Sequence, residues 1–136
     1  DNAYAIGGVA GHAGVFASAI DVHRIVARLE ACAADRDDFV PGAIVREFWR
    51  REGTVADSTW GLGWDTPSAS GSMAGDRASA GTVGHLGFTG TSVWLDRERG
   101  AHVVFLTNRV HPRRDNERIK AVRPLVHDAV WEALDA

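Results

Sequence analysis

The stretch Gly84-His-Leu-Gly-Phe-Thr-Gly-Thr-Ser-Val-Trp-Leu-Asp-Arg-Glu-Arg-Gly-Ala-His-Val-Val-Phe-Leu-Thr-Asn-Arg-Val-His-Pro112 decides the fold of this chain. Glycines recur in its first third, and apolar residues dominate much of the remainder. This order is typical of a glycine-rich turn that leads into a β-hairpin. The triplet His85-Leu86-Gly87 stands at the mouth of the first strand of that hairpin.

The two strands of the hairpin differ in their apolar pattern. Residues 91–96 alternate between two faces, which predicts a half-buried strand. Val93 and Leu95 fall on one face, and Ser92 and Trp94 on the other. Residues 97–100 form the turn, in which the glycine supplies a positive φ. Residues 101–107 are almost uniformly apolar, which predicts a strand covered on both faces.

Three helices are expected around this hairpin. Ser18 and Asp21 resemble a capping box, and apolar residues at helical spacing predict a helix over about 19–33. Pro41 starts a second helix that runs to about residue 51. A third helix spans about 116–134, where Pro124 should kink or split it. Its apolar stripe consists of Ile119, Val122, Val126, Ala129 and Leu134.

The remaining segments are rich in glycine and small residues. Residues 1–17 suggest a tightly packed loop, since glycine lets backbone approach backbone. Residues 60–64 predict a short strand or extended turn, and 66–83 a long surface loop of the kind that serves a site. The fold class is therefore α/β of the α+β type, with an antiparallel sheet flanked by helices. The helical part covers about 1–58, and the hairpin with its closing helix about 84–136.

Composition excludes several function classes. The chain has 136 residues, enough for one domain with a real core. Its net charge of -3 gives no reason to expect nucleic acid as a partner. No apolar run approaches the ~20 residues that span a bilayer. The first residues lack the basic and apolar regions of a secretory signal, and the compartment stays open. The lone Cys32 is expected in the core.

Metal and phosphate sites are not expected from local spacing. The histidines follow no metal-ligand pattern, so we predict neither a metal nor a cofactor. The glycines of residues 8–14 lack the Lys-Ser/Thr ending of a phosphate-binding loop, and packing is their expected role. Trp60, Trp64 and Trp94 are expected in the core, with stacking on a ligand as the alternative.

Residues 84–112 and the helix that follows resemble the last third of the class C β-lactamase and esterase-like members of the serine β-lactamase and penicillin-binding-protein superfamily. The glycine-rich run Gly7–Ser18 and the element Gly61-Leu-Gly-Trp64 also resemble that family, in the expected order. The resemblance implies a partial transpeptidase-like fold and a small-molecule acyl substrate, with no cofactor.

The resemblance also implies which residues hold the substrate. His85 matches the Lys or His of the family triplet and faces the substrate, although a plain strand-end role is the alternative. Gly87 lets the strand approach the ligand, and Phe88 lends its backbone N–H to the oxyanion hole. Leu86 departs from the usual Thr, which removes a hydrogen bond of about 1 kcal/mol to a substrate carboxylate. This departure favours an ester or peptide over a penicillin.

The family nucleophile has no match in these residues. No Ser is followed three residues later by Lys, and neither Tyr-x-Asn nor Ser-x-Asn occurs. We therefore expect the C-terminal part of a serine hydrolase that forms an acyl-enzyme on an ester, amide or β-lactam, with no catalytic residue of its own and no activity alone. The alternative is a non-catalytic binding or interaction module. The apolar strand around 103–106 is expected to pair with the missing N-terminal portion or with a second copy.

Overall fold

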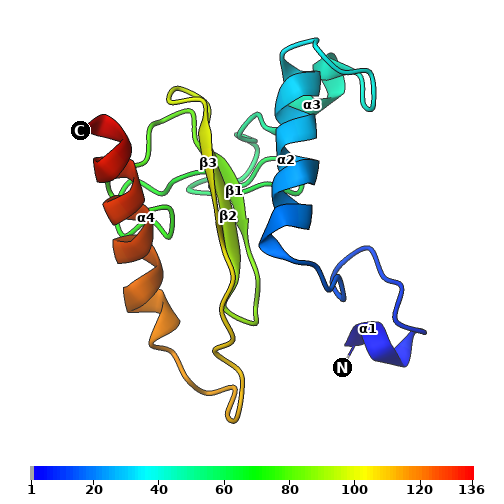
Figure 1. Cartoon of the computed structure of the whole chain (residues 1–136), viewed down its shortest axis with the longest axis vertical. Helices are drawn as coiled ribbons and strands as arrows, with labels where there is room; N and C mark the ends of the chain where they lie inside the picture. The colour runs from blue at the N-terminus through cyan, green and yellow to red at the C-terminus, as the bar shows by residue number, and fades with distance from the viewer. Residues whose placement is uncertain (1) are drawn as a thin grey trace.

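The computed structural model describes residues 2–136 and has three layers. A three-stranded sheet lies between α4 on one side and α2 with α3 on the other, as Figure 1 shows. The elements are α1 (Asn2–Ala5), α2 (Ala19–Ala33), α3 (Gly42–Phe48), β1 (Val83–Leu86), β2 (Ser92–Asp96), β3 (Ala101–Phe105) and α4 (Ile119–Asp135). The α+β architecture expected from the sequence is confirmed. No helix within the described residues is long and apolar enough to cross a membrane.

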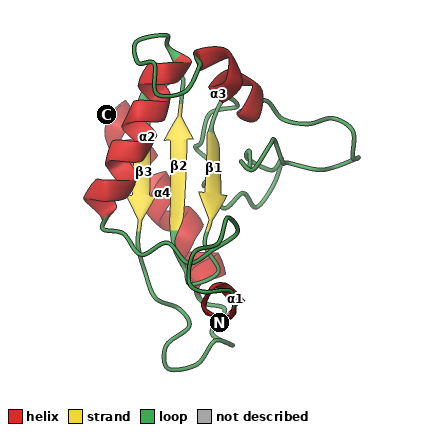
Figure 2. Ribbon diagram, turned by 90° about the vertical axis from the view of Figure 1, so that its right-hand side faces the viewer, coloured by secondary structure: helices red, strands yellow, loops and turns green. Residues whose placement is uncertain are grey.

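The sheet is an antiparallel meander with the order β1-β2-β3, seen face-on in Figure 2. His85 lies opposite Val93, and Trp94 lies opposite Val103. His85 and Leu86 therefore belong to a strand of their own, β1, which ends just before Gly87 and does not merely precede the hairpin. The extra strand leaves β2 in the centre, where four of its five residues are buried. The prediction that β2 is half-buried is thus wrong.

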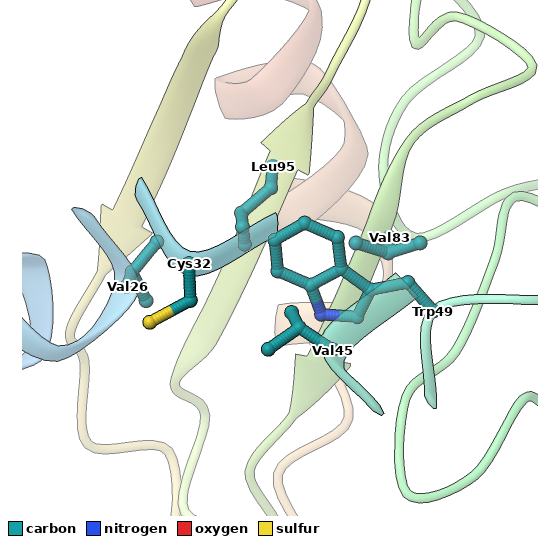
Figure 3. Packing of buried hydrophobic residues seen from close by; sticks show 6 residues of the cluster. All are labelled: Val26, Cys32, Val45, Trp49, Val83 and Leu95. Atoms are coloured by element: carbon teal, nitrogen blue, oxygen red, sulfur yellow. The ribbon is translucent and has the colours of Figure 1, made fainter. Parts of the chain in front are cut away.

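The first core lies between the sheet and the two helices α2 and α3. Figure 3 shows its six buried members, namely Val26, Cys32, Val45, Trp49, Val83 and Leu95. Cys32 is fully buried, as expected. The predicted alternation along β2 is confirmed, because Leu95 and Val93 pack on this side while Trp94 belongs to the opposite core.

The second core lies between the sheet and α4. Its buried members are Ala74, Trp94 and Trp131. The face that α4 buries consists of Arg123, His127 and Trp131. The predicted apolar stripe is wrong in part, since Val122 and Leu134 are 45% and 54% exposed.

Hydrogen bonds explain why polar groups replace apolar ones on this buried face of α4. His127 shares a hydrogen bond with Ser92, and the indole of Trp131 donates to the Ala74 carbonyl at 2.9 Å. The helix continues through Pro124 without splitting in two.

The N-terminal half confirms one prediction and corrects two. α2 begins and ends where the sequence indicated, and both hydrogen bonds of its capping box with Ser18 are present. α3 ends at Phe48 rather than near residue 51. The glycine-rich residues 6–17 are almost entirely exposed and extend away from the sheet (Figure 1). They therefore make no tight packing with the described chain.

Two further segments differ from expectation in their burial. Residues 66–82 have no regular structure, yet Thr66, Ser72, Ala74 and Thr82 are buried. This loop therefore completes the cores and is not simply a surface loop. In β3 every residue is partly exposed, because the strand forms an edge of the sheet and is not fully covered on both faces.

Candidate substrate-binding site

A tight turn carries the end of the triplet from β1 into β2. The Gly87 N–H donates to the Thr91 carbonyl at 2.8 Å, and the Gly90 N–H donates to the Gly87 carbonyl at 3.0 Å. Gly90 has a φ of 109°, a conformation that favours glycine. A Cβ on Gly87 would collide with the Thr91 hydroxyl, so a larger residue at this position would force the Thr91 side chain to move.

Arg109 fastens this turn to the segment that precedes α4. Its Nε donates to the Phe88 carbonyl at 2.7 Å, and its Nη1 donates to the carbonyls of Arg114 and Asn116 at 3.0 and 3.1 Å. The guanidinium carbon also lies 4.4 Å from the centre of the Phe88 ring. Because one guanidinium fills several backbone acceptors at once, it holds the turn in one position.

Arg123, on α4, contacts the same turn. It is 5% exposed, and its Nη2 donates to the Thr91 carbonyl at 3.1 Å with a longer contact of 3.5 Å to the Gly87 carbonyl. Burial, together with the nearby charge of Arg109, lowers the pKa of Arg123. Within residues 2–136 no carboxylate pairs with it. This buried positive charge favours an anion beside the turn.

The Phe88 N–H points away from the turn. The peptide bond between Gly87 and Phe88 is trans, so its C=O and N–H point in opposite directions. The Gly87 carbonyl is held inside the turn by Gly90, which leaves the Phe88 N–H directed outward. Among the residues that the structure describes, no acceptor receives it. The structure therefore presents an unpaired backbone donor at the predicted oxyanion position.

A pocket of about 280 Å³ opens beside this turn. It is lined by Leu86, Gly87, Phe88, Arg109, Ile119, Lys120 and Arg123. Three of these seven residues are basic. Glu117 pairs with Arg109 at 3.2 Å and also with Lys120, so within residues 2–136 only Arg123 of the three has no carboxylate partner. The pocket therefore suits a ligand that combines an apolar part with a carboxylate or another anionic group.

His85 does not line this pocket. Successive strand residues point to opposite faces, so His85 lies on the α2 side of the sheet, whereas Leu86 packs with the core on the α4 side. His85 is exposed and meets the Trp60 ring edge-on, with the centroids 5.5 Å apart. Trp60 is itself 45% exposed, so the expectation that it belongs to the core is wrong. The structure thus brings Leu86, Gly87 and Phe88 together and leaves His85 on the other face.

The outer edge of β1 is partly open. Gly84 exchanges both of its backbone hydrogen bonds with Asp65, at 2.7 and 2.9 Å. In an antiparallel ladder, alternate residues face the same neighbour, so the N–H and C=O of Leu86 are directed to this outer edge as well. The isolated bridge reaches Gly84 and does not extend to Leu86. An extended ligand could therefore continue this edge toward Phe88.

One Ser–His pair in the structure is not a catalytic dyad. Ser92 Oγ lies 2.9 Å from His127 Nε2, but the two residues are 4% and 0% exposed. Burial and the charge of Arg123 lower the pKa of His127 to about 4, so its imidazole is neutral at pH 7. This pair joins β2 to α4, and no substrate can reach it.

Sequence reasoning missed both Arg109 and Arg123. The apolar pattern of α4 drew attention to its aliphatic residues, although Arg123, His127 and Trp131 recur every four positions and mark one helical face. That spacing could have indicated that these residues form the buried face of α4. No pattern in the sequence marked Arg109, because its contacts depend on how the segment after β3 folds back. No group of three or more metal-ligating side chains occurs in the described part of the chain.

Comparisons with known proteins identify the family of this chain. A family model described as Beta-lactamase matches residues 1–127. Proteins of Salmonella agona and Salmonella typhi named "Putative D-alanyl-D-alanine carboxypeptidase" are each 33% identical over 120 residues, which is 85% of this chain. The chain spans 27% of the length of these relatives.

A solved structure supports the same fold. A β-lactamase from Mycobacterium bovis matches 90% of this chain and 46% of its own chain, with a TM-score of 0.73 and 21% identity. At this identity the likeness concerns the fold alone. The family match, in contrast, extends over nearly all of the sequence. The chain therefore belongs to the β-lactamase family of serine hydrolases, which includes penicillin-binding-protein-like enzymes.

Proposed function

We propose that this chain forms the substrate-holding wall of an active site that makes an acyl-enzyme on an ester, amide or β-lactam. The unpaired, outward-facing N–H of Phe88 is the observation that carries the proposal. Acyl transfer creates a negative charge on the carbonyl oxygen, and a fixed backbone donor stabilises that charge without reorganising. The Gly87 carbonyl, held by Gly90, sets the direction of this donor.

The proposed substrate lies along the outer edge of β1. Leu86 offers its backbone groups to an extended acyl chain, as a sheet edge does in peptide recognition. Arg123, which no carboxylate of residues 2–136 pairs, then attracts an anionic group of the substrate into the pocket that Arg109 and Lys120 also line. A peptide with a free carboxylate fits this arrangement, and the names of the Salmonella relatives are consistent with such a substrate. His85 would contact the substrate only from the α2 side of the strand.

The nucleophile and its base are proposed to come from residues outside this sequence. No Ser-x-x-Lys occurs here, and the relatives are much longer than the chain. We therefore propose that the chain corresponds to a C-terminal portion and is inactive alone. A fluorescent penicillin or a fluorophosphonate should leave the mass of the 136-residue chain unchanged. A longer protein that joins it to a Ser-x-x-Lys segment should gain one covalent label.

Exposed apolar surface supports a covering partner for this chain. Several large apolar side chains of the N-terminal half are more than half exposed, namely Tyr4, Ile6, Val9, Val15, Phe16, Ile20 and Ile25. The outer edge of β3 is also unpaired within the described sheet. We propose that the remainder of the same protein, or else a second copy, covers these surfaces. A clean monomer at high concentration by light scattering would contradict self-association.

Proline at position 88 tests the oxyanion role directly. Phe88→Pro in the longer protein removes the N–H and should slow acylation by about 10²–10³-fold. Phe88→Ala keeps the N–H and is the matched control, which should stay within a few-fold of the parent. Circular dichroism would verify that both variants fold. Equal acylation by the two variants would refute the oxyanion role, and a longer protein that never labels would instead favour a non-catalytic binding module.

A further inference from the structure

A chain of three polar side chains connects α2 to β3 on the sheet face opposite the candidate pocket. His23 Nδ1 lies 2.8 Å from His102 Nε2, and His102 Nδ1 lies 2.9 Å from Glu30 Oε2. His23 and Glu30 share one face of α2, since two helical turns separate them. Figure 2 shows α2 crossing over the sheet beside β3. None of the family resemblance or the proposed acyl chemistry involves these residues.

The two imidazole rings meet edge to edge. Their centroids are 5.0 Å apart and their planes differ by 28°. The two ring centres are 5.0 Å apart but the two nitrogens only 2.8 Å, so both nitrogens lie between the rings, near the line that joins their centres. The 2.8 Å approach of the two nitrogens therefore lies close to the ring planes, where imidazole lone pairs point. Because the other nitrogen of His102 donates to Glu30, the lone pair of its Nε2 is directed at His23.

We propose that His23 and His102 bind one divalent late-transition-metal ion, Cu²⁺, Ni²⁺ or Zn²⁺, between Nδ1 of the first and Nε2 of the second. Imidazole nitrogen suits these ions. Glu30 does not bind the ion itself. It accepts the Nδ1–H of His102, as a carboxylate typically does beside a ligating histidine, and so orients the ring. Water fills the remaining positions on the solvent side.

The spacing of the two histidines fits such an ion after a small movement. Two nitrogens on a tetrahedral Zn²⁺, each at about 2.0–2.1 Å, lie about 3.3 Å apart. The two nitrogens must therefore separate by roughly half an ångström, and the rings must turn so that both lone pairs point at the ion instead of at each other. His23 can supply this movement because it is exposed, whereas the His102 side chain is 11% exposed and lies on a strand. One ligand is thus held in place and the other can adjust.

The local charge also favours a cation. The carboxylate of Glu30 forms no ion pair with Lys or Arg within residues 2–136, and the side chain that it contacts is the imidazole of His102. The two arginines of α2, Arg24 and Arg28, pair instead with Asp21 at 3.5 Å and with Asp37 at 2.9 Å. The negative charge of Glu30 is therefore available to a metal-bound imidazole. The two histidines are 79 positions apart, so no local motif could have revealed the pair.

Metal titration of the tag-free 136-residue chain tests this site. Competition with a chromophoric chelator should show one Ni²⁺, Zn²⁺ or Cu²⁺ per chain. His23→Ala and His102→Ala should each weaken binding at least tenfold, and Glu30→Gln should weaken it by about tenfold. His12→Ala is the control, because that exposed histidine lies in the N-terminal loop and should leave affinity unchanged.

Two further readouts separate this site from adventitious binding. The Cu²⁺ electron paramagnetic resonance spectrum should show coupling to two imidazole nitrogens, reduced to one in His23→Ala. Added Zn²⁺ should raise the melting temperature of the parent chain but not of His23→Ala, because the ion ties α2 to β3. His23 is exposed, so its removal should not unfold the chain. Absence of one-to-one binding, or equal affinity in His102→Ala, would overturn the proposal.

Discussion

Protonation of His127 at low pH should weaken the packing of α4 against the sheet. This imidazole is fully buried, with Nε2 on the Ser92 hydroxyl and Nδ1 without a partner. Burial and the neighbouring charge of Arg123 lower its pKa from 6.5 to about 4. The unfolded chain therefore takes up a proton below about pH 6.5, and the folded chain only below about pH 4.

The size of the effect follows from this window. Above pH 6.5, His127 does not change the free energy of unfolding with pH, because the imidazole is then neutral in both the folded and the unfolded state. As the pH falls, the unfolded state binds the proton first and the free energy of unfolding decreases. The loss is about 2 kcal/mol at pH 5 and about 3 kcal/mol at pH 4. Such a change is a large fraction of the stability of an ordinary domain.

Urea unfolding followed by tryptophan fluorescence at pH 7, 5 and 4 measures this loss. His127→Gln removes the titrating group but keeps a donor for Ser92, so its stability should fall much less between pH 7 and pH 4. His12→Gln is the matched control and should behave like the parent chain. Where the glutamine variant is too unstable, the NMR titration of His127 in the parent gives its pKa directly. A pKa near 6.5, or identical acid profiles for all three chains, would refute the reasoning.

Substitutions at three other positions test the fold. The buried Asp96 accepts hydrogen bonds from Ser79 and Arg99, which outweigh burial and lower its pKa from 3.8 to about 2. Asp96→Asn should therefore cost about 2 kcal/mol at pH 7 in urea unfolding, a difference that vanishes as the pH falls from 4 toward 2. Ser18→Ala should cost about 1 kcal/mol by removing the helix cap, and Ser18→Asp should restore it in the same assay. Gly84→Ala should lower the melting temperature and cost about 3 kcal/mol, because the added methyl meets the ring of Trp94; parent-like stability would show that β1 packs differently.

Elements that depend on neighbouring residues could be predicted from the sequence. The capping box at Ser18, the span of α2 and the alternation along β2 all rest on contacts within a few positions, and each is confirmed. The positive φ expected at Gly100 in the turn between β2 and β3 is confirmed as well. The motifs also carried the family resemblance, which the match over residues 1–127 confirms. The roles assigned to His85, Leu86, Gly87 and Phe88 stay predictions.

Contacts between distant segments were decided by the tertiary structure alone. The buried face of α4 is polar because Arg123 and His127 find acceptors on the turn and on β2, more than thirty positions earlier. Hydropathy ranks these side chains as surface residues, since it counts the cost of removing them from water and not the hydrogen bonds that repay it. The direction of the Phe88 N–H and the meeting of His23 with His102 depend on the same long-range packing. Local sequence thus determined the elements, and their mutual packing determined which polar groups face one another.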